Sequence, residues 1–80
     1  MYSSIYRRFT KLLSEMTDAK KTNFTINTYF EKDLGLDKND LKILRSKIMD
    51  EFGVKLPKNI FKEFNTIGEL IGLIEAEFGR

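Results

Sequence analysis

The chain has 80 residues, a length that supports one domain with a single modest core. It contains no cysteine and no histidine, which excludes disulfides, thiol nucleophiles, the usual zinc sites and the commonest general base. The net charge of +2, from 14 basic and 12 acidic residues, is too balanced to indicate a nucleic-acid-binding protein.

The first predicted element is an amphipathic helix from Ser4 to Met16, whose start Ser3 or Ser4 can cap. Its apolar positions at helical spacing are Ile5, Phe9, Leu12, Leu13 and Met16. The residues before it do not resemble a signal peptide, because the charges follow the apolar residues. No apolar run is long enough to span a membrane, so we expect a soluble cytoplasmic protein.

The segment from Thr17 to Leu36 breaks the helical pattern. Its asparagines and threonines are poor helix formers, and Gly35 punctuates its end. A loop of this length in a small domain is usually functional or carries its own packing anchors. We expect an ordered loop whose anchors are Phe24, Ile26, Phe30 and Leu34.

A second helix is predicted to begin at Asp37, which suits a cap, with Asp40 placed to reach back to it. Its buried stripe consists of Leu41, Leu44, Ile48 and Phe52. Gly53 follows as a left-handed residue that ends the helix.

Pro57 suits the first turn of a short helix that holds Ile60, Phe61 and Phe64. A last helix follows Thr66, which forms a capping-box pattern with Glu69. The apolar positions of this helix are Ile67, Leu70, Ile71, Ile74 and Phe78. The predicted fold is therefore all-α, a small four-helix bundle of three main helices and one short one, in a single domain over residues 1–80.

Three strings resemble acyl carrier proteins, in the order and at the spacing of that family. FTINTYFEKDLGLD at residues 24–37 is similar to the family's loop, in which a Thr- and Asn-rich segment leads to Phe and then to Asp-Leu-Gly-x-Asp. DEFGVKLP at residues 50–57 resembles the string that closes the family's second helix. FNTIGELI at residues 64–71 resembles the opening of the family's last helix. The resemblance implies the acyl carrier protein bundle, with the long ordered loop between the first two helices.

The resemblance also points to a missing attachment residue. In acyl carrier proteins the serine after that aspartate carries 4'-phosphopantetheine through a phosphodiester, at a helix N-terminus that favours phosphate. The family signature there is Asp-Ser-Leu, whereas this chain has Asp37, Lys38 and Asn39. A lysine amine cannot form that phosphodiester, and the serines of the chain are Ser3, Ser4, Ser14 and Ser46. We therefore expect Lys38 to be unmodified and predict no cofactor, no metal and no catalytic residue.

The resemblance implies a docking face on the second helix, which is usually acidic in the family. In this chain Lys38, Lys42, Arg45 and Met49 form a stripe roughly 80° from the buried one, predicted to be largely exposed, with Ile43 on the solvent side. The predicted partner-binding residues are Asp37, Lys38, Asn39, Lys42, Ile43, Arg45, Ser46 and Met49. Two interpretations stay open: a solvated charged face, or a docking face suited to an acidic or mixed partner.

The leading hypothesis is a carrier-type domain that is not phosphopantetheinylated. It is expected to be a monomer and not an enzyme, and to act by protein contacts in or near fatty acid or polyketide-type biosynthesis. Its partners would include acyl-chain synthases or modifying enzymes.

Two alternatives remain. One is a working carrier of a divergent pathway, with non-covalent acyl binding or attachment elsewhere, although Phe52, Phe61, Phe64 and Phe78 argue against an expandable pocket. The other is a small helical nucleic-acid-binding domain, which would need the lysine stripe to extend into a broad basic patch.

Overall fold

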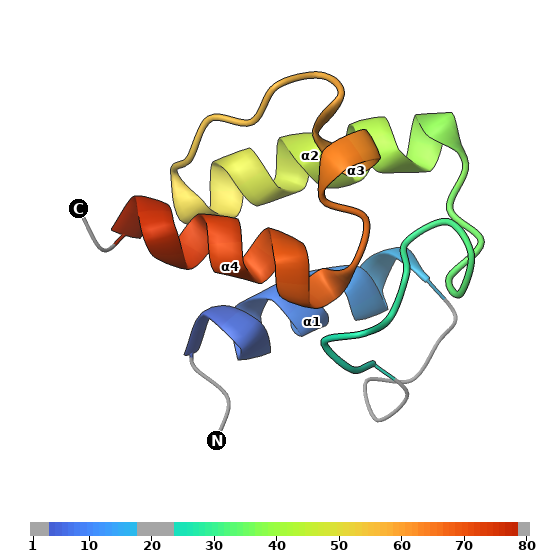
Figure 1. Ribbon diagram of the computed structural model, residues 1–80, viewed down its shortest axis with the longest axis horizontal. Coiled ribbons are helices and arrows are strands. Elements are labelled where there is room, and N and C mark those ends of the chain that lie inside the picture. The colour runs from blue at the N-terminus through green and yellow to red at the C-terminus, as the bar shows by residue number, and fades with distance from the viewer. Residues whose placement is uncertain (1–3, 18–23, 79–80) are drawn as a thin grey trace.

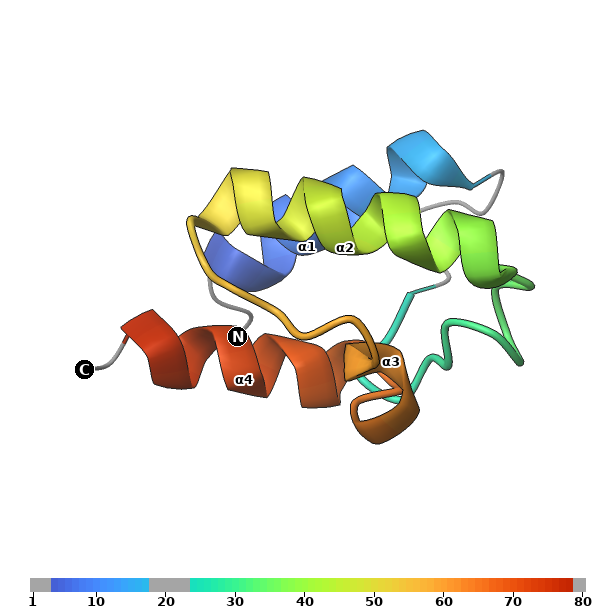
Figure 2. The same cartoon turned by 90° about the horizontal axis from the view of Figure 1, so that it is seen from above.

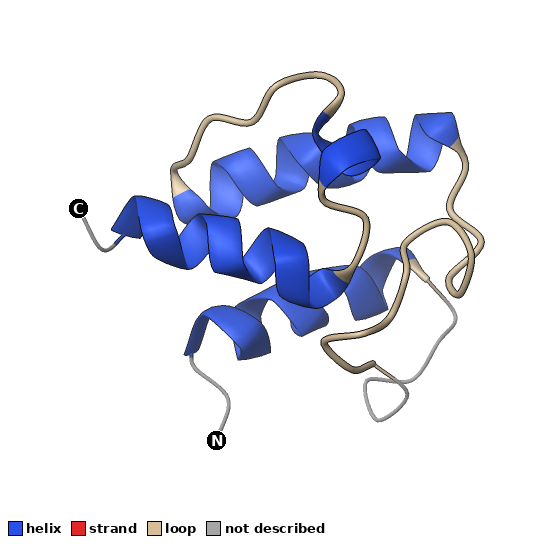
Figure 3. Ribbon diagram, viewed as in Figure 1, coloured by secondary structure: helices blue, strands red, loops and turns tan. Residues whose placement is uncertain are grey.

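The computed structural model describes residues 4–17 and 24–78. It contains the helices α1 (Ser4–Met16), α2 (Lys38–Phe52), α3 (Ile60–Glu63) and α4 (Ile67–Phe78) (Figures 1 and 3). The described residues form no strand, only an isolated antiparallel bridge between Tyr29 and Thr66. The predicted all-α bundle of three main helices and one short helix is confirmed. Ser3, one of the two predicted caps, and residues 18–23 of the predicted loop lie outside the described residues.

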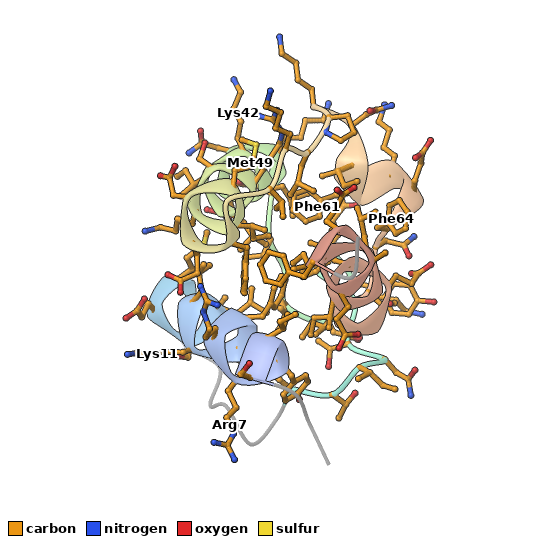
Figure 4. All side chains as sticks on the ribbon, turned by 90° about the vertical axis from the view of Figure 1, so that its left-hand side faces the viewer. Arg7, Lys11, Lys42, Met49, Phe61 and Phe64 are labelled. Carbon is orange, nitrogen blue, oxygen red and sulfur yellow. The ribbon has the colours of Figure 1, made fainter. Side chains whose placement is uncertain are left out.

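The three long helices lie side by side, and the end-on view shows them as a triangle around the core (Figures 2 and 4). Each helix turns its predicted apolar stripe inward because burial removes that surface from water. The fully enclosed side chains at the centre are Phe9, Phe30, Leu13, Leu44, Ile48, Ile67, Leu70 and Ile74. The short helix α3 adds Ile60 and Phe61 to the same core.

The loop between α1 and α2 supplies the aromatic centre of this core. Phe30 is 1% exposed, and its ring lies 5.1 Å from that of Phe61 in an edge-on arrangement and 6.1 Å from that of Phe9. Phe24 and Leu36 from the same loop are also buried. The predicted ordered loop is therefore confirmed over its described part, because its own side chains enter the core.

The same loop also satisfies the free N–H groups at the start of α4. Helix starts leave these donors without partners in the helix itself. The N–H of Ile67 donates to the carbonyl of Thr28 at 3.0 Å, and that of Gly68 donates to the carbonyl of Ile26 at 2.8 Å. The N–H of Glu69 donates to the Thr66 hydroxyl at 3.2 Å, as the predicted capping pattern requires. These bonds hold the loop and α4 together.

Seven of the predicted buried side chains are less buried than expected; besides Ile26, Phe78, Leu41 and Phe64 these are Ile5, Met16 and Leu34, which are partly buried. Ile26 is 48% exposed, although its backbone carbonyl accepts the N–H of Gly68 and its Cβ lies close to that glycine at the start of α4. Phe78 is 47% exposed at the end of α4, with one face toward the ring of Phe52 at 6.2 Å. Leu41 and Phe64 are only partly buried, at the edge of the core.

Candidate docking face and attachment position on helix α2

The start of α2 is held by a reciprocal pair of hydrogen bonds. The Asp37 side chain accepts the N–H of Asp40 at 2.8 Å, and the Asp40 side chain accepts the N–H of Asp37 at 3.1 Å. This is the predicted capping box, with aspartate at the position where glutamate is more usual. Both carboxylates also lie where the helix dipole favours negative charge. The first helical residue, Lys38, is therefore held at a rigid position.

Two hydrogen bonds within the preceding loop fix the path of the chain ahead of this cap. The Asp33 side chain accepts the N–H of Tyr29 at 2.8 Å, and the N–H of Leu36 donates to the carbonyl of Phe30 at 3.2 Å. Gly35 adopts a φ of +67°, a left-handed conformation that glycine tolerates best. Asp33 therefore ties down the loop, and the predicted cap at Asp37 is confirmed.

Lys38 is exposed in the first turn of α2, and Asn39 beside it is exposed too. The threonine hydroxyls in the described part of the loop accept hydrogen bonds within it: that of Thr28 accepts the N–H of Thr25 at 2.9 Å, and that of Thr25 accepts the N–H of Asn27 at 3.1 Å. Ser46 is exposed, but it lies eight residues further along, about 12 Å at the helical rise.

The predicted docking residues divide into two groups in the structure. Five of them join Asp37 on the solvent side, with Ile43 42% exposed; these are Lys38, Asn39, Lys42, Ile43 and Ser46. The prediction of a largely exposed stripe is wrong for Arg45 and Met49, which are half-buried. The reason is that the chain after α2 folds back over their side of the helix, as Figure 4 shows at Met49.

Arg45 and Met49 fasten that returning segment to α2. The Nε of Arg45 donates to the carbonyl oxygen of Leu56 at 2.8 Å and to that of Pro57 at 3.1 Å. The sulfur of Met49 accepts the N–H of Leu56 at 3.4 Å. Both side chains therefore have a structural role in placing the segment between α2 and α3.

We expect Arg45→Ala to lower the free energy of unfolding by about 1–2 kcal/mol, because a charged donor to two carbonyls is lost from a half-exposed site. Lys42→Ala is the matched control on the same helix, and it should change stability by less than about 0.5 kcal/mol. Urea denaturation of both variants measures the difference. Equal stability of the two variants would contradict the assigned role of Arg45.

The structure adds two lysines to the predicted face. Lys55 and Lys58 flank Leu56 and Pro57, the residues whose carbonyls Arg45 holds, and both lysines are exposed. Sequence reasoning missed them, although the segment from residue 53 to residue 62 contains lysines and no acidic residue. We call Lys38, Lys42, Arg45, Lys55 and Lys58 together the basic surface.

An open groove of about 490 Å³ lies between α1 and α2, with charged walls. It is lined by Arg8, Lys11, Leu12, Glu15, Lys47, Asp50 and Glu51. Arg8 and Glu51 form an ion pair across it at 2.9 Å, and the Arg8 guanidinium lies 4.7 Å from the centre of the Phe52 ring. Because six of the seven lining side chains are charged, the groove does not suit an acyl chain.

The described part of the chain contains no cluster of three or more carboxylate, histidine or cysteine side chains that could hold a metal ion. None of its helices combines the length and the apolar character needed to cross a membrane.

Comparison with known proteins gives one family and several relatives. A family model described as a phosphopantetheine attachment site matches residues 7–74. The acyl carrier protein of Borrelia garinii subsp. bavariensis is 31% identical over 75 residues, which cover 94% of each chain. That of Borreliella burgdorferi is 29% identical with the same coverage. That of Thermotoga maritima is 28% identical over 94% of this chain and 93% of its own.

Proposed function

Since the chain belongs to the acyl carrier protein family, we propose that it is a carrier-fold protein that acts without phosphopantetheine, through protein contacts on α2 and the segment that follows. We place these contacts in the cytoplasm, in or near fatty acid or polyketide-type biosynthesis. The proposed partners are acyl-chain synthases or modifying enzymes, the protein acts as a monomer, and it performs no catalysis of its own.

The observation that carries the proposal is the residue at the start of α2. A phosphodiester to the arm needs a hydroxyl, and the rigid first helical position presents the amine of Lys38 instead. When bound, phosphopantetheine supplies a thiol for acyl thioesters, so a chain without it has no covalent site for the acyl group. The residues at this position do not fit the group, because none of Asp37, Lys38 and Asn39 carries a hydroxyl.

The interior also supports a role in contacts more than in acyl storage. The space between the helices is filled by stacked and edge-on phenylalanines, with Phe9 6.1 Å from Phe30 and 6.5 Å from Phe52. We expect a long apolar guest to require displacement of these rings, because bulky side chains occupy the core. The interior therefore favours a filled bundle over non-covalent acyl binding.

The experiment is the intact mass of the purified chain after incubation with coenzyme A and a promiscuous phosphopantetheinyl transferase. We expect no mass gain for the natural chain and the gain of one arm for Lys38→Ser. A serine placed one turn later, in Lys42→Ser, is the matched control and should gain nothing, because it lies away from the helix start.

Two results would contradict the proposal. A mass gain by the natural chain would make it a working carrier, and peptide mapping would then locate the attachment residue. Failure of both Lys38→Ser and the double variant Lys38→Ser/Asn39→Leu, which restores the family signature, would contradict the assignment of position 38 as the attachment position.

A further inference from the structure

We propose that the basic surface is a docking site for an acidic protein surface. This inference rests on the proposed function, because it names the class of partner for the contacts proposed there.

The five basic residues come together through the fold. Lys38 and Lys42 lie four residues apart on one side of α2. The two bonds from Arg45 to the carbonyls of Leu56 and Pro57 bring the following segment against the same side. Lys55 and Lys58 stand on either side of those carbonyls and are exposed. Figure 4 shows Lys42 projecting from the outer side of α2, away from α1.

The positive charge of this surface is not neutralised within the described residues. None of the four lysines is in an ion pair with another described residue. The nearest carboxylates along the chain, those of Asp37 and Asp40, accept backbone N–H groups in the cap. Helix α4, by contrast, carries glutamates and no basic residue. An acidic partner surface would therefore complement the basic surface.

A basic patch could also bind a nucleic acid, but two observations favour a protein partner. The net charge of the whole chain is only +2, so a long polyanion would meet repulsive acidic faces beyond the patch. Among the described residues, the exposed aromatic side chains are Tyr29 and Phe78, and neither belongs to α2 or the segment after it. The patch itself therefore offers no ring for base stacking.

An anionic membrane could also attract the basic surface, but this surface lacks the apolar side chains that membrane binding by a helix requires. Interfacial binding by a helix requires bulky apolar side chains beside the lysines. The large exposed apolar residue of α2 is Ile43, about 100° round the helix from Lys42. It faces away from the segment that carries Lys55 and Lys58.

The test uses a fluorescent helical peptide with a stripe of glutamates, and a twin peptide in which glutamine replaces glutamate. We expect the full chain to bind the glutamate peptide at low salt at least 10-fold more tightly than the twin, by fluorescence anisotropy. Amide chemical shifts should change mainly over residues 38–58.

Two double variants decide the question, and each replaces two basic residues by glutamate in a different part of the bundle. Lys42→Glu/Lys55→Glu should weaken peptide binding at least 10-fold. Arg7→Glu/Lys11→Glu changes the net charge equally on α1 and should weaken peptide binding less than 3-fold. Arg7 points away from α2 (Figure 4), and Lys11 lines the groove between α1 and α2, outside the basic surface. These four residues are exposed, so both variants should fold, which circular dichroism verifies.

Equal losses of peptide affinity in the two double variants would overturn the proposal, because net charge alone would then explain the binding. Tighter binding of a single-stranded oligonucleotide or of phosphatidylserine vesicles than of the peptide, with the same sensitivity to Lys42→Glu/Lys55→Glu, would reassign the surface to that partner. The mass experiment separates the two proposals: an unprimed chain that fails to bind the peptide contradicts only the docking site, and a primed chain that binds contradicts only the proposed function.

Discussion

Replacing Phe30 by alanine should destabilise the protein by about 3–5 kcal/mol, the usual loss for a fully buried phenylalanine. Its ring joins those of Phe9 and Phe61, and its N–H donates to the carbonyl of Asn65 at 3.1 Å beside the start of α4. A domain of 80 residues has a free energy of unfolding of about 4–12 kcal/mol. The variant should therefore lose a large share of its free energy of unfolding, which urea denaturation followed by circular dichroism measures.

Phe78→Ala removes the same side chain from a position that is 47% exposed and serves as the control. The free energy of unfolding of this variant should fall by about 1 kcal/mol, because less apolar area returns to water and no enclosed cavity forms. Comparable destabilisation by the two variants would contradict the placement of the loop phenylalanine at the centre of the core.

Two glycines of α4 should respond in opposite directions to alanine. A Cβ at Gly68 would lie 2.8 Å from the carbonyl oxygen of Ile26 and 2.9 Å from its Cβ, and neither atom can move without moving the loop. Overpacking of this kind costs about 1–3 kcal/mol, which outweighs the better helix propensity of alanine. We expect Gly68→Ala to lower stability by about 1–2 kcal/mol and to break the bond from its N–H to Ile26, measurable as faster amide exchange.

Gly72→Ala is the matched control, one turn further along α4. A Cβ there meets nothing within 4 Å, so only helix propensity changes. Its stability should rise by about 0.5–1 kcal/mol. A loss of stability in Gly72→Ala, or a gain of stability in Gly68→Ala, would show that the contact between the loop and α4 is not as close as described.

Most of the fold follows from local sequence patterns. The apolar spacing of α2 predicts the burial of Leu44 and Ile48, and Asp37 with Asp40 predicts the helix start, because caps and amphipathic stripes act within one or two turns. The exposure of Ile26 could not be predicted this way. Its backbone pairs with Gly68, which lies 42 residues further along the chain, and no local pattern reports such a contact.

The candidate site was predictable in its position but not in its extent. The resemblance indicates α2, and helical spacing places Lys38 and Lys42 on one side of it. Spacing also predicts exposure for Arg45, but the segment after the helix returns over that side and accepts its hydrogen bonds. The same segment adds Lys55 and Lys58 to the basic surface, so the extent of the site depends on the tertiary contact between this segment and α2.

The central claim is that this carrier fold works without its arm, and the most direct test is the intact mass of the protein isolated from the cells that produce it. We predict a mass equal to that of the unmodified polypeptide, with Lys38 recovered unaltered in its peptide. A species heavier by one phosphopantetheine, or by an acylated one, would contradict the claim and make the protein a working carrier.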